Sequence, residues 1–126
     1  MPVPPRNGIL HVVDAAGYSL AGFRRLVAET AARQELAGGA IGAAFMLWAG
    51  ATALQMLGFV ALLLLLIAVE ALNTAIEVLT DRISPEWSAD AKQAKDLGSL
   101  AVGLMVLCNV GYLAVFAAHQ FALLPN

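Results

Sequence analysis

The stretch MLGFVALLLLLIAVEALNTAIE, residues 56–77, joins a long apolar run to a polar segment that contains Glu70 and Glu77. As a helix it is long enough to cross the roughly 30 Å hydrocarbon core of a bilayer. A carboxylate inside such a helix is costly unless it is paired, protonated or part of a solvated site, and it is a functional candidate by default. The stretch therefore predicts both a membrane span and a site on it.

Two further apolar blocks, Leu36–Leu54 and Leu100–Leu124, lie on either side of this stretch. The 126 residues are 60% hydrophobic and only 13% charged, which is more apolar than a small soluble domain can bury. We predict an all-α membrane protein forming a single domain over residues 1–126. Its transmembrane helices are expected at about 36–53, 56–80 and 98–122. The glycines in the first block lower helix propensity but are typical of close helix packing in membranes.

The basic residues lie only before the first predicted span or between the second and third. They are Arg6, Arg24, Arg25, Arg33, Arg82, Lys92 and Lys95. The positive-inside rule then predicts a cytoplasmic N-terminus and a cytoplasmic loop at 81–97, with residues 49–57 and the 119–126 tail outside. Charges throughout the first 35 residues argue against a signal peptide. The net charge of −2 does not favour nucleic-acid binding, and the single cysteine, Cys108, excludes an intramolecular disulfide.

Residues 9–33 mix apolar and charged side chains, interrupted at Gly17 and Gly22, and predict one or two amphipathic helices at the membrane surface. Arg25, Glu29 and Arg33 are spaced by four, so on one helix they would form an ion-pair ladder. Tyr18 and Ser19 follow Gly17 and are open to two interpretations. They form either a polar turn that touches a ligand or an interfacial anchor with a helix cap.

The polar residues of the second span fall on one helix face. At 100° per residue, Glu70, Asn73 and Glu77 lie within about 60° of one another, and Glu77 is about 10 Å from Glu70 along the axis. Because that separation prevents a shared proton, we expect the two glutamates to have different roles. Glu77, nearer the cytoplasm, suits Mg²⁺, with Glu29 as a second carboxylate. A structural alternative is a stripe of interhelical hydrogen bonds with Glu70 protonated.

The predicted cytoplasmic loop has no glycine-rich phosphate loop of the P-loop type. Lys95 and Asp96 can neutralise phosphate and accept a hydrogen bond from a base or ribose. They can equally be interfacial anchors at the end of a membrane helix.

The chain resembles the prokaryotic diacylglycerol kinase family over nearly its whole length. The resemblance rests on Ala-Ala-Gly-Tyr-Ser at 15–19, Arg-Gln-Glu at 33–35, Glu-Ala-Leu-Asn-Thr-Ala-Ile-Glu at 70–77, Asp-Arg-Ile at 81–83 and Ala-Lys-Asp-Leu-Gly-Ser at 94–99. It implies a homotrimer of three-span subunits in the bacterial inner membrane. Such an enzyme uses ATP and Mg²⁺ to phosphorylate the hydroxyl of diacylglycerol, giving phosphatidic acid.

The resemblance also implies roles for individual residues. Glu70 is the general base, Asn73 positions the reacting groups, and Glu29 and Glu77 hold the metal. The residues implied in binding ATP are His11, Tyr18, Glu29, Glu77, Glu86, Lys95 and Asp96. Those implied in binding the lipid are Ser19, Glu35, Glu70 and Ser99.

The chain departs from the family's pattern in two places, and other functions are also open. His11 stands where the family commonly has arginine, and the segment between Ser19 and Glu29 is one residue shorter than in near relatives. Relatives with a similar Asn-Thr-Ala-Ile-Glu core phosphorylate undecaprenol. A small proton-coupled transporter would also use an intramembrane glutamate, and a purely structural membrane subunit would need none of this chemistry.

Overall fold

The computed structural model describes residue 4 and residues 6–122, and within them every regular element is a helix. The helices are α1 (Ile9–Leu26), α2 (Thr30–Trp48), α3 (Ala53–Ile83) and α4 (Ala89–Gln120). The last four residues of the predicted outward tail, 123–126, lie outside the described part. The prediction of an all-α chain is confirmed.

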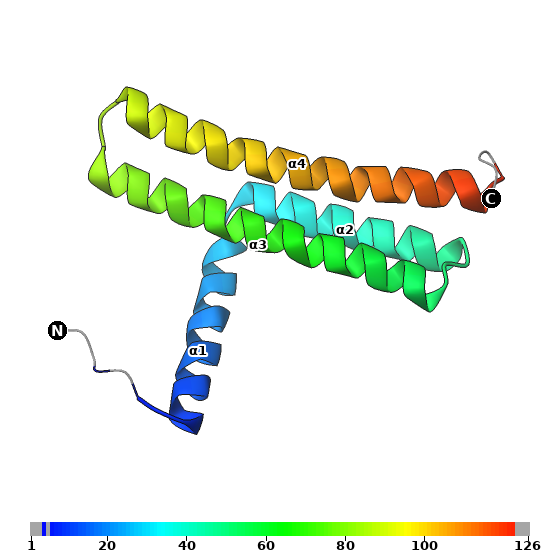
Figure 1. Cartoon of the computed structure of the whole chain (residues 1–126), viewed down its shortest axis with the longest axis horizontal. Coiled ribbons are helices and arrows are strands. Elements are labelled where there is room, and N and C mark those ends of the chain that lie inside the picture. The colour runs from blue at the N-terminus through cyan, green and yellow to red at the C-terminus, as the bar shows by residue number, and fades with distance from the viewer. Residues whose placement is uncertain (1–3, 5, 123–126) are drawn as a thin grey trace.

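Helices α2, α3 and α4 lie side by side as a bundle, and α1 leaves the bundle at a steep angle where α2 begins (Figure 1). The α3–α4 hairpin extends beyond the start of α2, past the point where α1 leaves the bundle (Figure 1). Within the described residues, α3 and α4 are the helices long and apolar enough to cross a membrane. Many of their large apolar side chains face outward, as expected for lipid contact.

The expected surface helix at 9–33 is wrong at its C-terminal boundary, because α1 ends at Leu26 and α2 begins at Thr30. The break is stabilised by Arg33, whose Nη1 donates to the carbonyl oxygens of Val27 and Ala28, both at 2.9 Å. Glu29 has an extended backbone at the start of α2. The expected ladder therefore keeps its Arg25–Glu29 ion pair, at 2.7 Å, while Arg33 caps carbonyls instead.

The loop between α3 and α4 is also shorter than the expected 81–97. Helix α3 continues to Ile83 and α4 begins at Ala89, because charged residues beyond the apolar run stay helical. Ser88 caps α4 by accepting from the backbone N–H of Ala91 at 3.1 Å. At the opposite end, Thr52 and Gln55 form a capping box that starts α3.

Glycines bring α2 close to its neighbours, as the sequence predicted. A Cβ on Gly39 would stand 2.6 Å from a methyl carbon of Leu63, and one on Gly42 would stand 3.0 Å from the Phe59 ring. Farther along the bundle, Met46, Phe59 and Phe116 form the buried core. This packing holds the N-terminal end of α2 against the middle of α3, where the polar stripe begins.

Candidate functional site

The predicted polar stripe on α3 faces the inside of the bundle. Glu70, Asn73 and Thr74 are all buried, with Glu70 only 4% exposed. Asn73 Nδ2 donates to Oε1 of Glu77 at 3.4 Å, a long bond that links two members of the stripe. The stripe thus runs from a buried carboxylate to a half-buried one on the same helix.

Glu70 has a carboxyl partner on another helix. The carboxyl groups of Glu35, on α2, and Glu70 lie within hydrogen-bonding reach of each other. Two carboxyl groups this close repel each other when both are ionised, which favours a state in which the pair holds one proton. The sequence predicted that Glu70 and Glu77 do not share a proton. In the structure the carboxyl partner of Glu70 is Glu35 on α2.

Glu29 and Glu77 lie close enough to Glu70 for their charges to act on it. Glu29 begins α2 and uses Oε1 to accept from Arg25, and Glu77 uses Oε1 to accept from Asn73. The described residues contain no group of three or more His, Cys, Asp or Glu side chains suited to a metal. Glu29 and Glu77 are each partly exposed, and Mg²⁺ usually takes one or two carboxylates and completes its shell with phosphate and water.

A second cluster lies at the α3–α4 turn, around a cavity of about 370 Å³. Its lining includes Glu86, Lys95 and Asp96, three of the residues predicted to bind ATP. Lys95 Nζ donates to Oδ1 of Asp81 at 2.6 Å, and this hydrogen bond raises the pKa of Lys95. Lys92 pairs with Asp96, also at 2.6 Å. The cavity therefore holds two ammonium groups and three carboxylates, and both ammonium groups are paired with carboxylates of the same lining.

The structure does not bring every predicted residue to these clusters. His11 and Tyr18 are exposed on α1, and Tyr18 is 75% exposed. Ser19 lines a groove of about 800 Å³ between α1 and α3, opposite Thr74. Ser99 is exposed on α4, directly after Gly98, which contacts Asn73.

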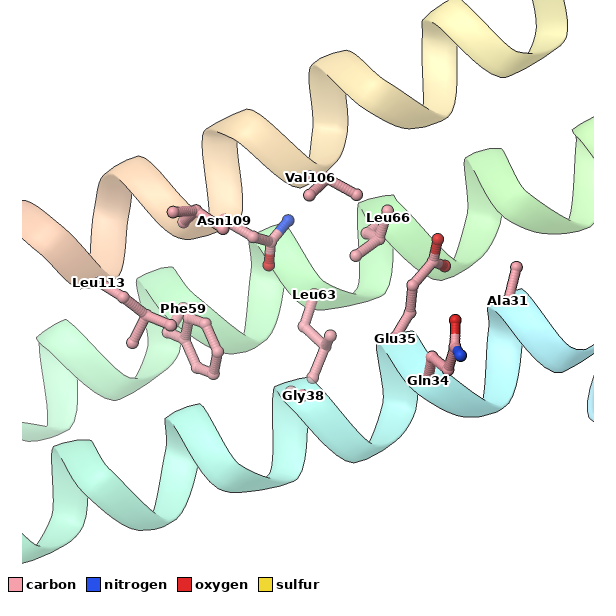
Figure 2. Close-up of a pocket in the computed structure, with 12 residues that line it drawn as sticks. Ala31, Gln34, Glu35, Gly38, Phe59, Leu63, Leu66, Val106, Asn109 and Leu113 are labelled. Atoms are coloured by element: carbon pink, nitrogen blue, oxygen red, sulfur yellow. The ribbon is translucent and has the colours of Figure 1, made fainter.

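The sequence did not predict three features of the site. The Glu35–Glu70 pair was not foreseen because spacing within one helix says nothing about a neighbouring helix. The Asp81–Lys95 contact joins residues 14 apart across the α3–α4 turn. Asn109 is buried in α4 and lines a cavity together with Glu35 (Figure 2). A polar side chain in an apolar run was the signal for it.

Comparison with known proteins gives a consistent result. A family model for prokaryotic diacylglycerol kinase matches residues 17–117. A diacylglycerol kinase from Sinorhizobium sp is 45% identical over 113 residues, covering 90% of this chain and 82% of that protein. One from Escherichia coli K12 is 34% identical over 105 residues, covering 82% and 86%. One from Pseudomonas aeruginosa is 39% identical over 105 residues, covering 79% and 82%.

The matched region begins within α1, includes all of α2 and α3 and ends near the end of α4, so it contains both polar clusters. On this evidence the chain belongs to the prokaryotic diacylglycerol kinase family.

Proposed function

We propose that this protein transfers the γ-phosphoryl group of Mg-ATP to the hydroxyl of membrane diacylglycerol, giving phosphatidic acid and ADP. The observation that supports this most directly is the buried Glu35–Glu70 carboxyl pair, with Glu29 and Glu77 close to Glu70. A proton held by Glu35 leaves Glu70 as a carboxylate, which is the form that a general base needs.

In the proposed reaction Glu70 accepts the proton of the lipid hydroxyl as its oxygen bonds to the γ-phosphorus. The bond between that phosphorus and the β–γ bridging oxygen breaks, and ADP leaves. Glu29 and Glu77 would hold Mg²⁺, which would supply neutralisation of phosphate charge, and Asn73 positions the reacting groups through its contact with Glu77. Positioning and charge neutralisation supply most of the acceleration in phosphoryl transfer.

The two substrates reach this site from different sides. The lipid enters from the bilayer, where Ser19, Glu35 and Ser99 are its proposed contacts. The nucleotide enters from the cytoplasm, where the cavity lined by Glu86, Lys95 and Asp96 receives it. We assign His11 and Tyr18 to the nucleotide as well, although both lie on exposed positions of α1.

The proposed assembly is a homotrimer of three-span subunits in the bacterial inner membrane, with the N-terminus in the cytoplasm. Helix α2 supplies the third span, since its 19 residues extend about 28 Å. One observation supports a larger assembly: α1 makes little contact with its own bundle.

The test is transfer of labelled γ-phosphate from Mg-ATP to diacylglycerol and, separately, to undecaprenol in mixed micelles. We expect labelled phosphatidic acid. A preference for undecaprenol would assign the chain to the other lipid substrate, and no transfer to either lipid would refute a lipid kinase and favour the transporter.

A further inference from the structure

A cavity of about 320 Å³ lies among α2, α3 and α4, and Glu35 forms part of its lining. Its walls are mostly apolar, and its polar side chains are Gln34, Glu35 and Asn109. Figure 2 shows Asn109 extending from α4 and Glu35 from α2 toward the same space, with Leu63 and Leu66 between them. The cavity therefore places two polar groups from different helices at one apolar site.

Asn109 is only partly satisfied by the protein. Its Nδ2 donates to the carbonyl oxygens of Met105 at 2.8 Å and Leu62 at 3.1 Å, so it ties α4 to α3. The side chain is 7% exposed, and its Oδ1 is buried with no hydrogen-bond partner among the described residues. A buried amide oxygen without a donor is unfavourable in a low-dielectric interior. The site therefore requires a donor from outside the described residues.

Glu35 lines the other side of the cavity, and its carboxyl group is paired with that of Glu70. Its Oε2 is buried, and no N–H or hydroxyl group of the described residues donates to it. Two acceptor oxygens cannot bond to each other, but water can donate to each of them. One water occupies about 30 Å³ of liquid volume, so the cavity has room for several.

We propose that this cavity binds water, which donates to Oδ1 of Asn109 and Oε2 of Glu35. Asn109 is then a positioning residue that acts through water and Glu35 on Glu70. This effect on Glu70 rests on the proposed function, whereas the hydration does not. An acyl chain in the cavity would fill its apolar part and leave both oxygens without a donor.

Hydration is tested by water-edited solid-state NMR on the full chain in bilayers, with labelled asparagine and leucine. We expect rapid magnetisation transfer from water to the Asn109 side-chain amide, assigned by its loss in Asn109→Leu. Leu107, two positions away and 68% exposed, is the control and should receive magnetisation from lipid instead. Transfer to Asn109 from lipid alone, or at a rate equal to that of Leu107, would overturn the proposal.

The effect on catalysis is tested with Asn109→Leu and Asn109→Ser. Both variants lose the bond to Leu62, but serine keeps an oxygen that can accept from water while its hydroxyl donates to Met105. We expect Asn109→Leu to lower kcat by about fivefold to tenfold with the KM for Mg-ATP unchanged, and Asn109→Ser to recover most of kcat. Equal losses of kcat in the two variants would overturn the positioning role. If the wild type itself phosphorylates no lipid, the proposed function fails while the NMR result still decides hydration.

Discussion

The side chain of Asn73 on α3 lies directly against Gly98 on α4, in the space that a Cβ on Gly98 would need. Asn73 Oδ1 is buried there and has no hydrogen-bond partner among the described residues. The absence of a side chain at Gly98 therefore lets α4 approach the polar stripe at the level of Asn73. This contact joins the helix that carries the carboxylates to the helix that carries Lys95 and Asp96.

Gly98→Ala should disturb the site as well as the packing. The added methyl group forces Asn73 or α4 to move, at a cost of about 1–3 kcal/mol in stability. Lipid kinase activity should fall more steeply than the amount of folded protein, because Asn73 also donates to Glu77. Thermal unfolding in detergent and activity per folded molecule measure the two effects. Gly103→Ala is the matched control, since nothing lies within 4 Å of a Cβ there.

Two variants of Glu35 should show whether the reaction needs a hydrogen-bond donor beside Glu70. In Glu35→Gln the amide N–H can donate to Glu70 permanently, so activity should stay within about tenfold of wild type. In Glu35→Ala the buried Glu70 carboxylate loses this donor, and activity should fall further. Initial rates at saturating Mg-ATP and lipid measure the difference. Equal activity in the two variants would show that the pair has no part in the reaction.

The Asp81–Lys95 contact should affect nucleotide binding rather than the chemical step. Asp81→Asn removes the carboxylate that holds the Lys95 ammonium, so the KM for Mg-ATP should rise severalfold while kcat changes little. Kinetics with varied Mg-ATP at saturating lipid measure this. Arg82→Gln removes a neighbouring exposed charge and is the control. A lowered kcat with unchanged KM would place Asp81 in the chemical step instead.

Mixed assemblies should reveal whether α1 serves a neighbouring subunit. Tyr18 is exposed on α1, whereas Glu29 lies near Glu70 in the same chain. We therefore expect Tyr18→Ala and Glu70→Gln chains, each of low activity, to recover activity when unfolded and reassembled together. Glu29→Gln mixed with Glu70→Gln should recover none. No recovery in the first mixture, with mixed oligomers shown by crosslinking, would refute a shared site.

The sequence predicted the helices whose signal is local. The predicted span 56–80 lies within α3, and 98–122 lies within α4 except for residues 121 and 122. Long apolar runs of this length have few structural alternatives to a helix. The break between α1 and α2 was missed because neither proline nor glycine occurs at residues 27–29. It depends on Arg33, which donates hydrogen bonds to the backbone carbonyls of Val27 and Ala28. Hydrophobic periodicity does not reveal such a contact.

The candidate site was predictable to a similar degree. The burial of Glu70 and Asn73 follows from helix geometry, since both lie on the same face of one apolar helix. The pairing of Glu70 with Glu35 was not predictable, because it depends on how two helices are placed side by side. Glycines set that placement: Gly39 lets α2 approach Leu63 closely, and this brings Glu35 to the level of the stripe.

The most direct test of the central claim is the rate of lipid phosphorylation by Glu70→Gln, a change that keeps the size of the side chain and removes its basicity. The protein must be shown to remain assembled, and Asp90→Asn, at an exposed position in the first turn of α4, controls for loss of a carboxylate. We expect kcat to fall by about 10²- to 10⁴-fold in Glu70→Gln and to be unchanged in Asp90→Asn. Assembled Glu70→Gln with a kcat within about threefold of wild type would contradict the role of Glu70 as the general base.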